Sequence, residues 1–144
     1  MVTRLLITFG VLIYAGVVPW LEINDTHVFN PEWPPHARLH EVWQLITNTA
    51  LGAFCLWRCW GRNDIRLPAV LALLIMGGFL AALALADHYG GSMVLREGGV
   101  ERTVLGLNLG VIGALLVVIT AVAALTLDLR RGRHTPERGP APRR

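Results

Sequence analysis

The sequence predicts an all-α integral membrane protein, an antiparallel four-helix transmembrane bundle with both termini in the cytoplasm. Three observations predict this class. Hydrophobic residues make up 53% of the 144 residues and charged residues only 16%, whereas a typical soluble domain carries about 25% charged residues. Four apolar segments are long enough to cross a hydrocarbon core, which needs about 20 helical residues. Arginine is also concentrated on one side of these segments.

The four spans are expected at about residues 5–20, 39–60, 67–86 and 104–127, within a transmembrane domain at 1–129. Each span must be helical, because a lone strand in lipid leaves its backbone groups unpaired. The first span could instead be a cleaved signal peptide, since Arg4 precedes an apolar stretch. However, residues 17–20 lack a small-residue cleavage pattern, and Trp20 suits an interfacial anchor. An uncleaved helix is therefore the favoured interpretation.

The distribution of arginine predicts the orientation. The N-terminus, the loop between the second and third spans and the C-terminal segment carry ten arginines and three acids, whereas the other two loops carry three arginines and seven acids. Because positive charge is retained on the cytoplasmic side, both termini are predicted to face the cytoplasm from the cell (inner) membrane. Residues 130–144 are rich in Arg, Pro and Gly. They are expected to form a disordered basic tail beside anionic lipid head groups, with no support for nucleic-acid binding.

A polar stripe is predicted on the second helix. Pro34 and Pro35 fit the first turn of a helix, where a missing N–H costs nothing. From there four polar residues follow at four-residue intervals: His36, His40, Gln44 and Asn48. Residues at this spacing share one helix face. Because polar groups in a membrane are costly unless they face the bundle interior, we expect the stripe to point toward the other helices and to meet Asn108.

Four of the five histidines fall at the predicted outer face, and they suggest two kinds of site. As metal ligands, the candidates are His27, His36, His40, His88 and Asp25, for zinc, iron or copper. As acid and base groups acting on a lipophilic substrate, the candidates are His36, His40, His88 and Asp87. The alternative is a non-enzymatic accessory subunit or small-solute channel, in which these polar residues only hold the bundle together.

The segment Asn30-Pro31-Glu32-Trp33-Pro34-Pro35-His36-Ala37-Arg38-Leu39-His40, followed by Trp43, resembles a family of small four-span membrane proteins without an established activity. The shared pattern is N-P-x-W-P-x-H-x-x-x-H between the first two helices. The resemblance implies the four-span fold, and it implies that Asn30, Trp33, His36 and His40 act as a unit. It implies no catalytic role for any of them.

Small residues predict how the spans pack. They recur every four residues on the third and fourth spans: Gly78, Ala82, Ala86 and Gly106, Gly110, Ala114. Such stripes let membrane helices approach closely. They could serve packing within one chain or a homo-oligomer.

Overall fold

The computed structural model describes residues 1–93 and 103–133, and its described part is almost entirely helical. The first helical segment consists of α1 (Val2–Leu12), a π-helical turn η1 (Ile13–Val17) and α2 (Val18–Glu22). The other long helices are α3 (Pro35–Gly61), α4 (Arg66–Ala84) and α6 (Leu109–Arg133). Shorter elements are α5 (Ala86–Tyr89) and the strands β1 (Thr103–Val104) and β2 (Leu107–Asn108). Of the predicted disordered tail, residues 134–144 lie outside the described residues.

Three of the long segments are apolar enough to cross a membrane: Val2–Glu22, Arg66–Ala84 and Leu109–Arg131. They pack together, so a helical, multi-pass protein associated with a lipid bilayer is supported. The helix α3 has 27 residues and is long enough to span, but its composition is more polar and it is not among the three.

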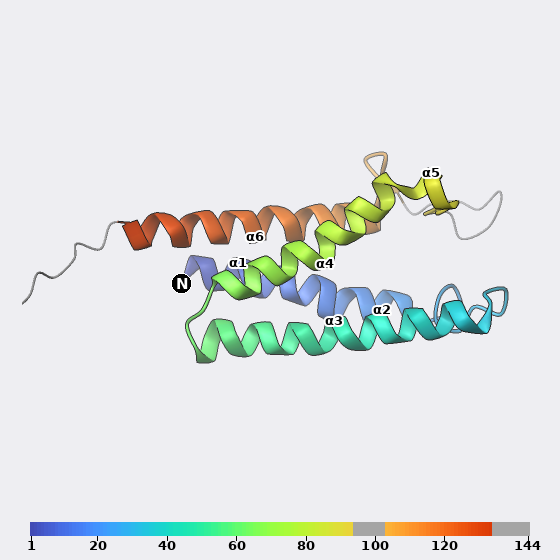
Figure 1. Ribbon diagram of the computed structural model, residues 1–144, viewed down its shortest axis with the longest axis horizontal. Coiled ribbons are helices and arrows are strands. Elements are labelled where there is room, and N and C mark those ends of the chain that lie inside the picture. The colour runs from blue at the N-terminus through green and yellow to red at the C-terminus, as the bar shows by residue number, and fades with distance from the viewer. Residues whose placement is uncertain (94–102, 134–144) are drawn as a thin grey trace, which may run out of the picture.

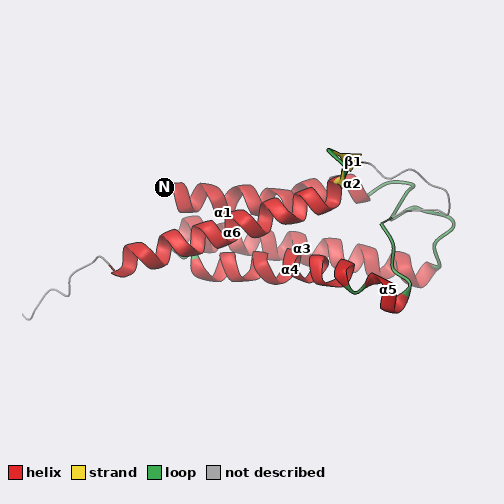
Figure 2. Ribbon diagram, turned by 90° about the horizontal axis from the view of Figure 1, so that it is seen from above, coloured by secondary structure: helices red, strands yellow, loops and turns green. Residues whose placement is uncertain are grey.

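The four long segments run in alternating directions along one axis (Figures 1 and 2). Both α1 and α4 contact α3 on one side and α6 on the other. The N-terminus, the connection from α3 to α4 and the end of α6 therefore share one end, which we call the arginine end because Arg4, Arg58, Arg66 and Arg130 lie there. The opposite end carries residues 23–34, α5 and the two strands, and we call it the loop end.

Small and branched apolar side chains fill the interior. Ile7, Val11, Val117 and Ala121 are buried between α1 and α6. Many large apolar side chains instead point outward, including Leu74, at 66% exposed, and Ile119, at 60%. An apolar outer surface is what a helix bundle presents to lipid, so the burial pattern agrees with membrane association.

The first helical segment crosses α3 closely at its π-helical turn. Pro19 has no N–H to donate to the carbonyl of Ala15, four residues earlier, and the Thr49 hydroxyl of α3 donates to that carbonyl at 3.3 Å. Beside it, a Cβ on Gly52 would stand 2.2 Å from the Cβ of Ala15. Only glycine lets the two helices approach this far.

Two helix starts compare differently with the sequence predictions. The second helix begins at Pro35, with Pro34 as its N-cap, as the two prolines predicted. The fourth begins at Leu109 rather than near 104, because β1 and β2 form an antiparallel hairpin there. Its turn residues Leu105 and Gly106 have φ of 52° and 78°, the left-handed values that two-residue hairpin turns require. Gly106 therefore serves a turn and not a helix-packing stripe.

Candidate functional site

A pocket of about 370 Å³ lies at the loop end, between the first helical segment, α4 and α6. Its walls are mostly apolar and come from the three apolar helical segments, with Ile13, Val17, Met76, Ile112 and Leu116 among them. Its polar lining comes mainly from the end of α2 and the residues that follow: Glu22, Asn24, Thr26 and His27. A cavity of this size, with polar groups on one part of an apolar wall, has the character of a small-molecule site.

A pair of ionisable side chains, Glu22 and His27, lies in this polar lining. His27 Nε2 lies 2.8 Å from Glu22 Oε2, and each side chain is 25% exposed. On the other side of the ring, His27 Nδ1 lies 2.8 Å from the Thr26 hydroxyl. That hydroxyl is in turn 2.6 Å from Asn24 Oδ1. Glu22, His27, Thr26 and Asn24 thus form one continuous hydrogen-bonded chain beside the pocket, which we call the Glu22–Asn24 chain.

The Glu22–Asn24 chain of hydrogen bonds allows more than one position for a proton. The Thr26 hydroxyl has one hydrogen and two acceptor neighbours, Asn24 Oδ1 and a neutral Nδ1 of His27. If the hydrogen goes to His27, the Nε2–H of the ring donates to the Glu22 carboxylate. If it goes to Asn24, Nδ1–H donates to Thr26, and the ring is cationic beside a carboxylate or neutral beside a carboxylic acid. The arrangement can therefore hold or pass a proton at the pocket.

Local hydrogen bonds to the backbone hold the Glu22–Asn24 chain in place. Asn24 Oδ1 accepts from the backbone N–H of Thr26 at 2.8 Å, and Asn24 Nδ2 donates to the carbonyl of Leu21 at 2.6 Å. This turn, in which an Asn side chain replaces a backbone partner, reverses the chain direction after α2. The Val28 N–H then donates to the Glu22 carbonyl at 3.2 Å. His27 consequently folds back beside Glu22 at the end of the preceding helix.

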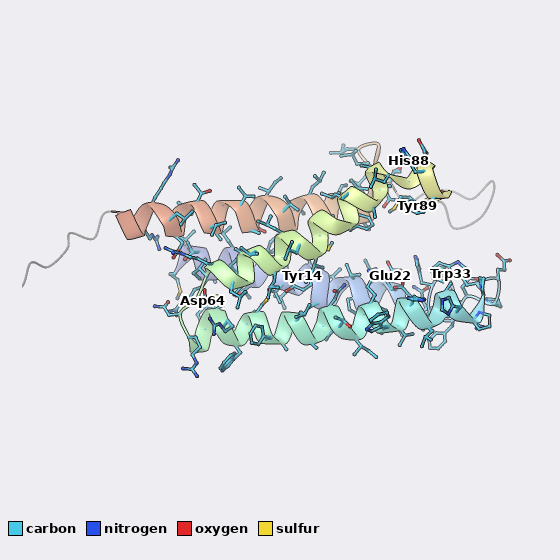
Figure 3. The ribbon with its side chains drawn as sticks, in the orientation of Figure 1. Tyr14, Glu22, Trp33, Asp64, His88 and Tyr89 are labelled. Atoms are coloured by element: carbon cyan, nitrogen blue, oxygen red, sulfur yellow. The ribbon has the colours of Figure 1, made fainter. Side chains whose placement is uncertain are left out.

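The motif residues Asn30 and Trp33 support this same loop. Asn30 is 2% exposed, and its side chain donates to the Thr26 carbonyl at 3.0 Å and accepts from the Glu32 N–H at 3.0 Å. The Trp33 ring contacts the His27 ring edge-on, with centroids 5.5 Å apart. Asn30 thus braces the loop that holds His27, and Trp33 contacts the His27 ring itself. In the described part of the chain, no hydrogen bond or ring contact joins either residue to His36 or His40. Glu22 and Trp33 are labelled in Figure 3.

His36 and His40 form a separate pair. Both lie in the first two turns of α3 and are exposed. Their Nε2 atoms are 3.0 Å apart, and their rings are nearly perpendicular, at 80°. His40 also contacts the ring of Trp43, with centroids 5.8 Å apart.

The orientation predicted for the polar stripe is wrong for three of its four members. His36, His40 and Gln44 are exposed, and Asn48 is half-buried. The reason is geometric, because each four-residue step turns a side chain about 40° further around an α-helix. Gly52, on the packed face of α3, is four such steps from His36, so His36 lies about 160° away from the packed face. A stripe of residues at four-residue spacing therefore winds around the helix and does not stay against one neighbouring helix.

The remaining predicted site residues lie apart. Asp87 and His88 are exposed on α5, on the other side of the loop end from Glu22 (Figure 3). Asp25 is exposed in the loop after α2. Asn108 lines the pocket, where its Oδ1 accepts from the Gly110 N–H at 2.8 Å in the first turn of α6. Among residues 1–93 and 103–133, no three His, Cys, Asp or Glu side chains are grouped so that they could hold a metal ion.

Sequence reasoning missed Glu22, the residue that pairs with His27. Glu22 was counted only among the seven acids of the two predicted outer loops. The available signal was the run Glu22-Ile23-Asn24-Asp25-Thr26-His27, in which an Asn-led turn directly follows the end of a span. Such a turn brings residues five apart in sequence back together.

The chain was also compared with known proteins. No protein-family model, curated protein or solved structure matches it. The resemblance of residues 30–43 to four-span membrane proteins therefore stays a prediction.

Proposed function

We propose that the chain is a four-span membrane protein whose pocket binds an amphiphilic small molecule, with its polar head against Glu22 and His27. The observation that carries this proposal is the pocket of about 370 Å³, which has apolar walls and is lined at the loop end by the Glu22–His27 pair. No residue of α3 lines the pocket, so a ligand would lie between the three most apolar segments.

The chemistry of the lining favours a particular head group. Glu22 offers an acceptor, and His27 offers a donor or an acceptor depending on its protonation. Glu41 of α3 also interacts electrostatically with Glu22. A head group that both donates and accepts hydrogen bonds, such as a hydroxyl, fits this set better than an anion, which the carboxylates would repel.

The same residues would support acid–base chemistry on such a ligand. The Thr26 hydroxyl and the Glu22 carboxyl contact opposite nitrogens of the His27 ring. A bound hydroxyl that replaces the Thr26 hydroxyl at Nδ1 can therefore give its proton to that nitrogen, while Nε2 passes its own proton to the Glu22 carboxylate. In this proposal His27 is the acid–base group, and Glu22 and Thr26 position its ring.

The topology belongs to the same proposal. We infer that α3 is the fourth span and that both termini are cytoplasmic. The support is the alternating direction of the four long segments. Arg4, Arg58, Arg66 and Arg130 also gather at the end that holds the N-terminus and the end of α6. Arginine at one end of a bundle favours the cytoplasmic side.

A photoreactive long-chain alcohol tests the pocket, with the matching alkane as the control probe. We expect the alcohol to label pocket peptides that contain Met76 or Ile112. Gly113→Leu should abolish this labelling, because a Cβ at Gly113 meets only the Ile13 side chain, at 3.6 Å, and the longer side chain then fills the pocket. Glu22→Gln should reduce the preference for alcohol over alkane about tenfold, the usual effect of losing one charged hydrogen bond.

Asp87→Asn is the matched control, because Asp87 is exposed and lies outside the pocket lining. This variant should label as the unaltered protein does. If Gly113→Leu labels normally, the pocket is not a ligand site. If Glu22→Gln lowers the melting temperature but leaves the alcohol preference intact, the Glu22–Asn24 chain only fastens the loop, which is the structural alternative.

A further inference from the structure

The exposed face of α3 carries a seven-residue pattern along its whole length. Eight residues follow alternating steps of four and three, and every one of them is exposed: His36, His40, Trp43, Thr47, Ala50, Phe54, Trp57 and Gly61. We call this set the α3 seam. It lies opposite Gly52, on the side of α3 away from the first helical segment. A repeat of 3.5 residues is the spacing with which two α-helices pair side by side.

The seam offers much of the surface that a stable pairing needs. Trp43 is 64% exposed, Trp57 50% and Phe54 39%. Aromatic side chains bury about 150–250 Å² each, so these three alone offer roughly 600 Å² between two copies. That is more than half of the about 1,000 Å² expected of a specific interface. The other seam residues after Trp43, namely Thr47, Ala50 and Gly61, are small enough for two helices to approach each other.

The histidine pair at the start of the seam has the spacing of two ligands on one ion. Zinc binds imidazole nitrogen at about 2.0–2.1 Å, so two nitrogens of a tetrahedral site lie about 3.3 Å apart. The Nε2 atoms of His36 and His40 are already 3.0 Å apart. In this pair one Nε2 carries the hydrogen. On metal binding that hydrogen moves to Nδ1 of the same ring, which leaves both rings neutral.

Within residues 1–93 and 103–133 of one chain, this site is incomplete. A closed zinc site takes four protein ligands, and the described residues bring no third His, Cys, Asp or Glu to the pair. A second copy with the same membrane orientation would pair in parallel through the seam and would present its own His36 and His40 at the same level. Four imidazoles would then surround one point.

We propose that two copies of this chain pair in parallel along the α3 seam, and that His36 and His40 of both copies bind one divalent transition-metal ion between them. The proposal does not depend on the pocket, which lies on the opposite side of the first helical segment and contains no α3 residue. If the pocket proves not to bind a ligand, the proposed pairing is unaffected, and the reverse also holds.

The metal is tested with zinc chloride on the full chain in detergent or nanodiscs. We expect one zinc per two chains by elemental analysis, and a mass corresponding to a dimer by light scattering. His36→Ala and His40→Ala should each weaken zinc uptake at least tenfold. His88→Ala is the control, because His88 is an exposed histidine outside the pair, and it should bind zinc normally. One zinc per chain in a monomer, or unchanged uptake by His36→Ala, would overturn the shared site.

The seam is tested separately by cysteine cross-linking, so that a folding defect is not mistaken for lost binding. Ala50→Cys lies in the seam, and Ala53→Cys is also at an exposed position but lies outside the seam, about 60° around the helix from Ala50. Cys55 and Cys59 are fully buried and form the same background in both variants. Diamide oxidation should join two Ala50→Cys chains by a disulfide and leave Ala53→Cys single. Equal cross-linking of the two variants would overturn the parallel pairing.

Discussion

At the scale of single residues, Asp64 fastens the arginine end. Its carboxylate accepts from Arg58 at 2.6 Å and 3.1 Å, and from the backbone N–H groups of Arg66 at 3.0 Å and Leu67 at 3.3 Å. It thereby joins the last turn of α3 to the first turn of α4. Partial burial raises the pKa of this carboxyl, but the hydrogen bonds from Arg58, Leu67 and Arg66 outweigh burial, and the net pKa lies below its ordinary value of 3.8.

We expect Asp64→Asn to lower the unfolding free energy by about 1–2 kcal/mol at neutral pH, because the charged hydrogen bonds with Arg58 are lost. The folded pKa is below the unfolded pKa, so this contribution is complete above about pH 5 and disappears as the pH falls through the folded pKa. Thermal unfolding in detergent between pH 2.5 and 7 measures both. Asp25→Asn, at an exposed carboxylate, is the control. A stability difference that stays constant down to pH 2.5 would contradict the assignment.

Residue patterns in the sequence predicted some of these positions and not others. Pro34 and Pro35 predicted the start of α3, because proline acts through its own backbone. The pairing of His27 with Glu22 was not predicted. It depends on a turn around Asn24 that begins where α2 ends. The partner of His27 is set by this local turn, whose signal is the Asn that follows the span and not the spacing of the histidines.

At the scale of elements, the contact between η1 and α3 depends on one glycine. Pro19 removes a helical hydrogen bond, and Thr49 donates to the carbonyl that is left. Tyr14 of the same turn is 1% exposed. Gly52 lets these groups meet, since any larger residue would meet the Cβ of Ala15. The packing stripes predicted on the third and fourth spans did not identify this position, because it lies on the most polar helix.

Gly52→Ala should therefore cost about 2–3 kcal/mol of stability, the usual cost of overpacking a tight contact. Adding Ala15→Gly should recover part of this loss, since the Cβ that the new methyl group would meet is then absent. Gly78→Ala is the matched control in α4, where a Cβ would meet nothing within 4 Å. It should be neutral or slightly stabilising, because alanine favours the helix. Melting temperatures that fall equally in Gly52→Ala and Gly78→Ala would refute a specific contact at Ala15.

At the scale of the whole molecule, composition predicted the class of protein, and three apolar spans agree with it. The described arrangement adds that the N-terminus and the end of α6 lie at the arginine end (Figure 1). Hydropathy alone does not decide whether α3 crosses the membrane, because its apolar residues alternate with His40, Gln44 and Asn48. Its antiparallel packing beside α1 and α4 is what favours a fourth span.

Labelling with a membrane-impermeant maleimide decides the number of spans. We expect Asp25→Cys and Asp87→Cys, both exposed at the loop end, to react from outside intact cells. Arg62→Cys, exposed after the last turn of α3, should react only after permeabilisation. If α3 did not cross the bilayer, positions 25 and 62 would react from the same side and position 87 from the other. Unaltered protein is the control for background labelling, since Cys55 and Cys59 are both 0% exposed.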